Sequence, residues 1–210
     1  MNATAKVPVA ILISGRGSNM GALIAASLDA DYPARIVSVI SDKPDALGLE
    51  HARGFGIDAM AIPRPDFAGK SEHEAAVIAA IDASGAQIIA LAGYMRLLSG
   101  DFVKRYAGRM INIHPSLLPA FPGLATHERA LAAGCRVHGC TVHFVTEGMD
   151  EGPIIEQAAV RVEHDDTPET LAARVLEAEH RIYPEALAML ARGGVRMSVD
   201  GRARFADASG

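Results

Sequence analysis

The chain has 210 residues, of which 50% are hydrophobic and 21% charged, and its formal net charge at pH 7 is -5. These values are typical of a globular protein that is long enough to bury a sizeable core. No cluster of lysines and arginines is present, so the sequence argues against a nucleic-acid-binding protein.

The first half of the chain alternates short apolar runs with longer amphipathic segments. In chain order we predict strands at residues 7–14, 34–41, 57–63 and 87–93, and helices between them at 19–29, 45–56 and 71–85. Ser18 or Asn19 is expected to cap the first helix. Ser71 and Glu74 have the spacing of a capping box at the start of the third helix.

The second half is less regular. We predict strands at residues 109–114, 139–145 and 152–162, helices at 126–134 and 167–190, and a hairpin at the C-terminal end. Residues 152–162 are too many for one straight strand, and Pro184 is expected to break or kink the last helix. Asp200 and Gly201 lie between alternating runs and form the hairpin signal.

This order of elements predicts one α/β domain. Its sheet is expected to be mostly parallel, Rossmann-like and twisted, with about seven strands, helices on both faces and a C-terminal hairpin. Ligands of such sheets bind at the carboxyl ends of the strands. The polar residues that directly follow each apolar run are therefore the candidate site residues.

The composition also bears on location and cofactors. The N-terminal apolar run is too short for a signal peptide or a membrane span. Cys135 and Cys140 suggest no disulfide framework, so we expect a cytoplasmic protein with no membrane partner. Together with His138 and His143 these cysteines match no standard zinc spacing, and we expect no metal.

A glycine-containing turn, "ISGRGSNMG", follows the first predicted strand. Gly15 and Gly17 allow a ligand to approach the backbone, and free amides at a helix N-terminus attract an anion. Ser18 and Asn19 add side-chain donors. The glycine spacing misses the dinucleotide fingerprint by one residue, and the Walker lysine is absent. We therefore favour a phosphate site over a turn without a ligand.

The stretch "INIHPSLLPAFPG" places Asn112 and His114 at the end of a predicted strand. Residues two apart on a strand project to the same face. An amide donor beside an imidazole suits a carbonyl oxygen that becomes negative in a tetrahedral transition state. The alternative is a strand end whose polar groups bind loop backbone. The proline-rich loop that follows favours a site, because rigid loops without regular hydrogen bonding often hold functional residues.

Asp150 lies in a second polar cluster, "HFVTEGMDEGP", after another predicted strand. A carboxylate there could orient a histidine or raise its proton affinity, whereas the alternative is a turn-forming aspartate. Glu179 and His180 lie late in the long helix, where a solvated face is the default interpretation. No Gly-x-Ser-x-Gly motif is present, which disfavours covalent catalysis by a serine.

Taken together, the segments "SGRGSN", "LAGYMRLLS", "INIHPSLLPAFPG", "HGCTVHFVTEGMDEGPII" and "EAEHRIYP" resemble the folate-dependent formyltransferases that act on glycinamide ribonucleotide. The resemblance runs from about residue 7 to 192, in the family's order and spacing. It implies transfer of a formyl group from the co-substrate 10-formyltetrahydrofolate to the amine of glycinamide ribonucleotide in purine synthesis. It also implies one domain at residues 1–192, with a nucleotide-binding half (about 1–107), a catalytic half (about 108–192) and a hairpin or tail at 193–210.

The resemblance also assigns roles to matching residues. It implies that the catalytic residues are Asn112, His114 and Asp150. It implies that the ribonucleotide is bound by Gly15, Arg16, Gly17, Ser18, Asn19, Leu176, Glu177, Ala178 and Glu179. It implies that the folate pocket is lined by Lys70, Met95, Arg96, Leu97, Leu98, Asn112, Thr146, Glu147, Gly148, Met149 and Asp150.

One position departs from the family pattern. Members often have a histidine where this chain has Ala125 in "GLATH", while His127 is retained. A role of the missing histidine in substrate contact or proton transfer is therefore not carried over.

Three other functions remain open at this point. They are a methionyl-tRNA formyltransferase, which usually has an added RNA-binding domain, a formyltetrahydrofolate hydrolase, which usually has an added regulatory domain, and a catalytically silent binding protein. Small-molecule substrates are the expected partners, and the chain is expected to be a monomer or a homodimer.

Overall fold

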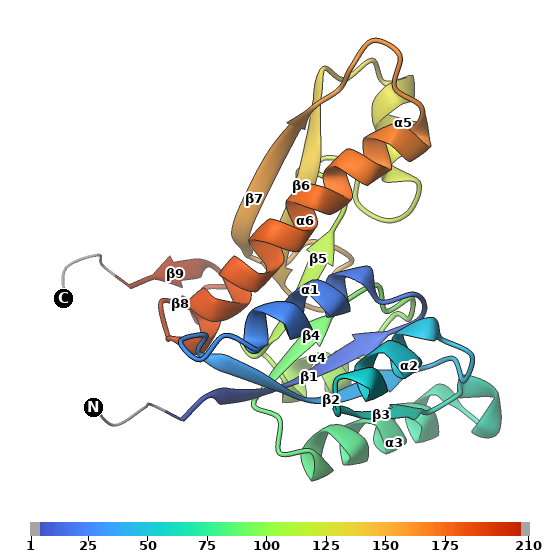
Figure 1. Ribbon diagram of the computed structural model, residues 1–210, viewed down its shortest axis with the longest axis vertical. Helices are drawn as coiled ribbons and strands as arrows, with labels where there is room; N and C mark the ends of the chain where they lie inside the picture. Colours follow the sequence, from blue (N-terminus) through green and yellow to red (C-terminus); the bar gives the residue numbers. More distant parts are fainter. Residues whose placement is uncertain (1–4, 207–210) are drawn as a thin grey trace.

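A twisted seven-stranded sheet forms the centre of the computed structural model, which describes residues 5–206 (Figure 1). The strands are β1 (Val7–Ile13), β2 (Ala34–Ser41), β3 (Asp58–Ala61), β4 (Ile88–Leu91), β5 (Met110–His114), β6 (Val137–Phe144) and β7 (Ile154–Arg161). Their order across the sheet is β3-β2-β1-β4-β5-β6-β7. The first five in chain order pair in parallel, and β6 and β7 continue the sheet in antiparallel pairing. The predicted mostly parallel sheet is confirmed.

Helices cover both faces of the sheet. They are α1 (Ser18–Ser27), α2 (Leu47–Gly54), α3 (Lys70–Ala83), α4 (Gly100–Arg105), α5 (Thr126–Ala132) and α6 (Pro168–Ala191), with a short 3-10 helix η1 (Arg64–Asp66). Along β1 the buried side chains alternate: Val9, Ile11 and Ile13 pack with α1, α2 and α6, while Ala10 and Leu12 pack with α3 and α4. A strand that is buried on both faces must be apolar throughout, which explains the unbroken apolar run at residues 7–13.

The order of the strands reverses at β1, since the chain first adds β2 and β3 on one side and then β4 on the other. Open α/β sheets bind ligands in the crevice at such a switch point, beyond the carboxyl ends of the strands. Here the loops after β1 and β4 meet. The Ser14 amide donates to the Gly93 carbonyl at 3.1 Å, and the Met95 amide donates to Ser14 Oγ at 2.8 Å.

The predicted C-terminal hairpin is confirmed as β8 (Val195–Met197) paired antiparallel with β9 (Ala203–Phe205). Gly201 in its turn has φ 71°, the left-handed conformation that glycine adopts without strain. The last four residues of the predicted tail, 207–210, lie outside the described residues. Among residues 5–206, no helix combines the length and apolar character needed to cross a membrane.

Two predicted helix caps are wrong. The N-cap of α1 is Gly17, with φ 73° and no side-chain hydrogen bond, so neither Ser18 nor Asn19 caps the helix. The side chain of Asn19 is used elsewhere, as described below. Helix α3 begins at Lys70 with Gly69 as an uncapped N-cap. The capping box fails because the Glu74 carboxylate accepts from the amide and hydroxyl of Ser99 at the start of α4.

Of the break or kink expected at Pro184, the break is wrong, because α6 runs without interruption from Pro168 to Ala191. Tertiary contacts at and next to the proline hold the helix in place. The Tyr183 hydroxyl donates to the Leu91 carbonyl at the end of β4 (2.9 Å), and the Pro184 carbonyl accepts from the Tyr32 hydroxyl (2.7 Å). Packing thus outweighs the lost backbone hydrogen bond.

Residues 152–162 were expected to be too many for one straight strand, and the structure contains a shorter single strand, β7, at Ile154–Arg161. The irregularity is confined to a register shift against β6, between Val142 and His143. A shift of this kind bends a strand without ending it.

Candidate active site

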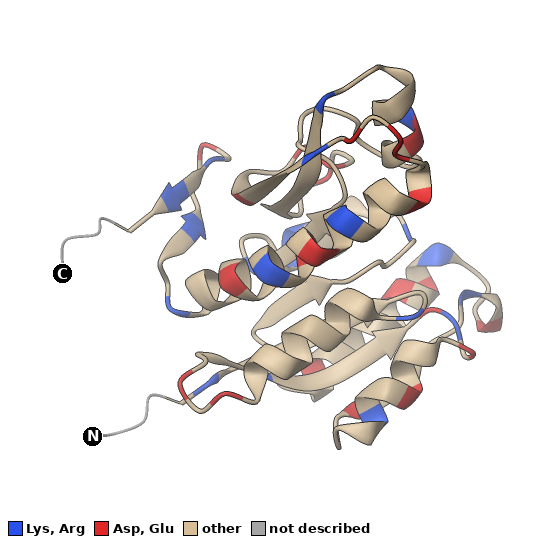
Figure 2. Cartoon of the chain, turned by 45° about the horizontal axis from the view of Figure 1, so that its top comes forward, with Lys and Arg blue, Asp and Glu red and all other residues tan. Residues whose placement is uncertain are grey.

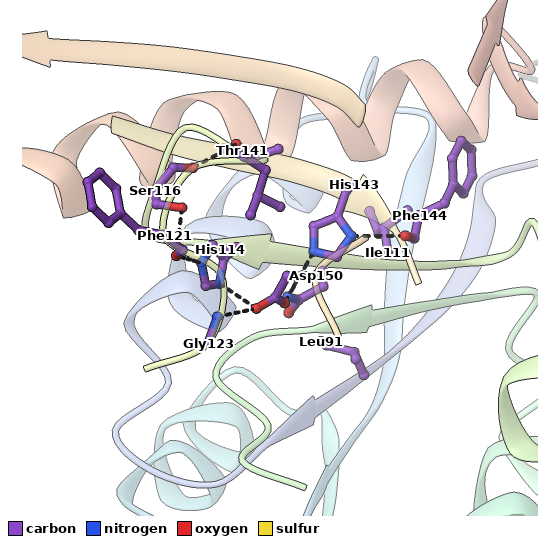
Figure 3. A network of polar contacts seen from close by, with 12 residues as sticks. Leu91, Ile111, His114, Ser116, Phe121, Gly123, Thr141, His143, Phe144 and Asp150 are labelled. Carbon is purple, nitrogen blue, oxygen red and sulfur yellow. Dashed lines mark hydrogen bonds and ion pairs between the residues drawn. The ribbon is translucent and has the colours of Figure 1, made fainter. Parts of the chain in front are cut away.

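Three polar side chains, His114, His143 and Asp150, converge beside the last residues of β5 (Figure 3). His114 is the last residue of β5, and the antiparallel pairing of β5 with β6 places His143 opposite Asn112. Asp150 comes from the loop that joins β6 to β7. The structure therefore brings together the three residues expected to act jointly, Asn112, His114 and Asp150, and adds a fourth.

The imidazole of His114 has an acceptor at each nitrogen. Its Nδ1 lies 3.4 Å from Asp150 Oδ2, and its Nε2 lies 3.0 Å from the Phe121 carbonyl oxygen. The side chain is only 6% exposed. A neutral imidazole can donate from one nitrogen only, whereas the imidazolium donates from both. The arrangement therefore suits the protonated form.

Asp150 links two loops at this point. Its Oδ2 accepts from the Gly123 amide at 2.8 Å as well as facing His114, and the side chain is 14% exposed. The backbone of Asp150 has φ 55°, a left-handed conformation in which aspartate and asparagine are enriched. A carboxylate at this position holds the proline-rich loop against the β6–β7 loop while it faces the imidazole.

His143 was missed as a site residue, since the sequence suggested only a weak metal interpretation for it. Its Nδ1 is 2.9 Å from the Phe144 carbonyl oxygen, and its Nε2 is 3.2 Å from Asn112 Nδ2. Burial lowers the pKa of His143, which favours the neutral ring. With the proton on Nδ1, Nε2 can only accept, so the Asn112 amide must present its NH2 group there. No sequence signal could reveal this pairing without the register of β5 and β6.

The proline-rich loop is held by a hydrogen-bonded network (Figure 3). Ser116 Oγ donates to the Ala120 carbonyl at 2.6 Å, and Thr141 Oγ1 donates to the Ser116 carbonyl at 2.7 Å. Gln157 Nε2 donates to the Leu118 carbonyl at 2.9 Å. These bonds give the loop the fixed conformation that its prolines suggested. A cavity of about 360 Å³ lies beside it, lined by Leu118, Pro119, Pro122, Met149, Asp150, Glu151, Gly152 and Ile154.

The remaining histidines and cysteines near this loop do not form a metal site. His127 and His138 pack edge to face with ring centroids 5.3 Å apart, and burial lowers the pKa of His138 to about 4. Burial raises the pKa of the Cys140 thiol to about 12. Within the described residues, no group of three or more His, Cys, Asp or Glu side chains is placed to hold a metal ion.

The glycine-containing turn after β1 lies at the start of α1 and reaches across to α6. Asn19 Nδ2 donates to Glu179 Oε2 at 2.7 Å, although the two residues are far apart in sequence. Glu179 is 6% exposed, and this burial raises its pKa to about 7, against the lowering effect of the bond from Asn19. Glu179 is therefore not on a solvated helix face, which was its default interpretation. In the turn itself, three of the residues implied to bind the ribonucleotide are exposed, namely Gly15, Arg16 and Ser18.

On α6, the other residues implied to meet the ribonucleotide differ in exposure. Leu176 and Ala178 are half-buried, while Glu177 is exposed. The structure thus brings Asn19 and Glu179 into contact and leaves the Glu177 side chain exposed.

Apart from Lys70 and Asn112, the residues implied to line the folate pocket come from two segments. In the first, residues 94–99 follow β4, and Arg96 Nε is 2.5 Å from the buried carboxylate of Asp42, while Leu98 is half-buried. Met95 and Leu97 are 67% and 68% exposed, an unusual exposure for apolar side chains. Lys70 Nζ is 3.8 Å from Glu74 Oε1.

In the second segment, residues 146–149 precede Asp150. Thr146 and Gly148 are half-buried, and Met149 is exposed. Glu147 Oε1 is 3.3 Å from Lys104 Nζ. Figure 2 shows acidic and basic residues interspersed along the helices and strands.

Known formyltransferases are similar to this chain in sequence and in structure. Residues 7–187 match the formyl transferase family model. The chain is 43% identical over 189 residues to a phosphoribosylglycinamide formyltransferase from Escherichia coli (strain K12), covering 90% of this chain and 89% of that protein. A crystal structure of phosphoribosylglycinamide formyltransferase from Brucella melitensis is 59% identical, with a TM-score of 0.86, and covers 89% of this chain and 96% of that one.

A longer relative is also similar. The trifunctional purine biosynthetic protein adenosine-3 from Gallus gallus is 47% identical over 199 residues. This match covers 95% of the present chain, which spans about 20% of the length of that relative.

Proposed function

The chain belongs to the formyl transferase family, and from this premise we propose that it transfers a formyl group from 10-formyltetrahydrofolate to the amine of glycinamide ribonucleotide, a step of purine biosynthesis. The observation that carries the proposal is the contact of His114 with Asp150, beside Asn112, at the carboxyl end of β5. The names of the relatives identify the acceptor.

The reaction is direct acyl transfer. The neutral amine attacks the formyl carbon, whose carbonyl oxygen becomes an oxyanion, and the bond from this carbon to the folate nitrogen then breaks. The amine loses a proton and the folate nitrogen gains one. Neither a metal nor a nucleoside triphosphate is required for this sequence of steps.

We assign oxyanion stabilisation to Asn112 and His114. Asn112 Nδ2 has two N–H groups, of which one is directed at His143 Nε2, so the second remains for the oxyanion. A preorganised donor of this kind is typically worth about 3–4 kcal/mol of barrier. His114 contributes the charge of its protonated ring, which Asp150 stabilises from 3.4 Å.

The phosphate of the ribonucleotide would bind at the N-terminus of α1. Backbone amides of residues 15–19 are available there, and Gly15 has open space around the position of a Cβ. Glu179 would accept a hydrogen bond from the substrate amine, since Asn19 already holds one of its oxygens. In this arrangement the distance between the N-terminus of α1 and Glu179 on α6 would match the distance between the phosphate and the amine of the ribonucleotide.

The folate would bind between residues 95–98 and 146–150, beside the cavity near Asp150. The exposed apolar side chains of Met95, Leu97 and Met149 would be covered by its ring systems. Lys70 would contact an acidic part of the folate. The partners proposed are therefore small molecules, with no nucleic acid or membrane, in a cytoplasmic monomer or homodimer.

A steady-state assay with the folate donor tests the proposal. Formylation should occur with glycinamide ribonucleotide, while methionyl-tRNA and water alone should give no more than background turnover. Comparable turnover with methionyl-tRNA would favour the tRNA enzyme, and folate hydrolysis without an acceptor would favour the hydrolase. No turnover with any acceptor, with ligands still bound, would favour a silent binding protein.

A further inference from the structure

The N-terminus of α2 packs directly against the glycine-containing turn after β1. The Gly48 amide donates to the Gly15 carbonyl at 3.2 Å. Helix dipoles are positive at the N-terminus, so this carbonyl lies where its partial negative charge is favoured. We infer that Gly48 is a positioning residue that sets the orientation of the phosphate-binding amides, an inference that rests on the proposed function.

There is no room for a side chain at Gly48. A Cβ there would lie 2.5 Å from Ile13 Cδ1, 3.1 Å from the Gly15 oxygen and 3.4 Å from the Arg16 oxygen. From the other side, a Cβ on Gly17 would lie 3.2 Å from Gly48 Cα. The backbones of the turn and of α2 are therefore in close contact, and an added Cβ must move the end of the Ile13 side chain and press on the Gly15 carbonyl.

This contact determines where the amides of the turn point. In a trans peptide the carbonyl and the N–H of the next residue lie in one plane and point in opposite directions. The Gly15 and Arg16 carbonyls face α2, so the N–H groups of Arg16 and Gly17 point away from it. No backbone carbonyl among residues 5–206 accepts from either amide. Two donors without a backbone acceptor therefore point away from α2, toward the place where the proposed phosphate would bind.

A second contact keeps α2 in this place. A Cβ on Gly21, one turn into α1, would lie 3.2 Å from His51 Cε1 on α2. The two helices are thus closely packed over their first turns. Because no gap separates the two helices, a shift of the start of α2 would also shift the turn.

The variant Gly48→Ala tests the inference, with Gly54→Ala as its matched control. Gly54 is the last residue of the same helix, and a Cβ there has nothing within 4 Å. We expect Gly48→Ala to raise the KM for glycinamide ribonucleotide by roughly tenfold or more, the usual effect of losing one hydrogen bond to a charged group. The turnover number and the KM for the folate donor should change little. Inhibition by inorganic phosphate should weaken by the same factor, and Gly54→Ala should behave as wild type.

Gly48→Ala could also act through its contact with the core side chain of Ile13. The double variant Gly48→Ala/Ile13→Val separates the two effects, because valine lacks Cδ1 and leaves only the carbonyl contacts. We expect it to recover thermal stability while the ribonucleotide KM stays high, and Ile13→Val alone to bind ribonucleotide normally. A normal KM in the double variant, or equal losses for both substrates, would overturn the inference. A wild-type enzyme that ignores the ribonucleotide would instead refute the proposed function.

Discussion

Glu179→Gln should stabilise the protein at alkaline pH while weakening the binding of the ribonucleotide. The Glu179 side chain is 6% exposed, and burial raises its pKa from the ordinary value of 4.5 to about 7. Its Oε2 accepts from Asn19, whose own Oδ1 is buried without a hydrogen-bond partner among the described residues. Glutamine keeps the acceptor, adds an NH2 group for that oxygen and carries no charge.

The sign and size of the effect follow from proton linkage. Between about pH 4.5 and pH 7 the folded protein retains the Glu179 proton while the unfolded chain has lost it. Stability therefore falls as the pH rises through this window, and it stays lower above pH 7. A shift of this size corresponds to about 3 kcal/mol as an upper estimate, which is a large part of the stability of a domain.

Urea unfolding of wild type and Glu179→Gln at pH 5 and pH 8 measures this difference. The two proteins should be close in stability at pH 5, and the variant should be more stable by roughly 1–3 kcal/mol at pH 8. Isothermal titration at pH 8 should show weaker ribonucleotide binding by the variant. A stability difference that is the same at both pH values would refute the idea that a buried charge at residue 179 is the cause.

Three further changes test other parts of the site and fold. Replacing His143 by phenylalanine removes the acceptor that orients the Asn112 amide, so turnover should fall roughly tenfold to a hundredfold at unchanged KM values. Asp150→Asn keeps a residue suited to its left-handed backbone but removes the charge that lies 3.4 Å from the imidazole, so turnover should fall by about a hundredfold. Gly139→Ala places a Cβ in overlap with the Ala158 carbonyl on β7, and thermal unfolding should show a loss of roughly 1–3 kcal/mol without a specific effect on either KM.

Much of the fold could be predicted because buried parallel strands have a strong sequence signal. The runs that became β1 and β4 are apolar throughout, as strands covered on both faces must be. The two wrong helix caps concern polar side chains with several possible partners. Glu74 could accept from its own helix or from Ser99, and only the folded arrangement decides between them.

The candidate site likewise contains residues that the sequence could bring together and residues that it could not. Asn112 and His114 could be paired from sequence, because the alternation of a strand puts them on one face. Their partners come from elements whose pairing has no local signal. His143 reaches Asn112 through the antiparallel register of β6, and Glu179 reaches Asn19 across the packing of α6 on α1.

The antiparallel strand β6 and the loop after it supply two side chains of the site, so the parallel strands alone do not form it. A parallel strand next to β5 would end at the same edge and send its following loop away to a crossover helix. Strand β6 instead runs back along β5, placing His143 against the Asn112 amide, and its following loop carries Asp150 to His114. The Gly123 amide donates to the same carboxylate, and this bond holds the proline-rich loop against the β6–β7 loop. Substituting Asp150 should therefore disturb both the charge at the imidazole and the order of residues 115–123, and hydrogen exchange at the Gly123 amide would report the second effect independently of turnover.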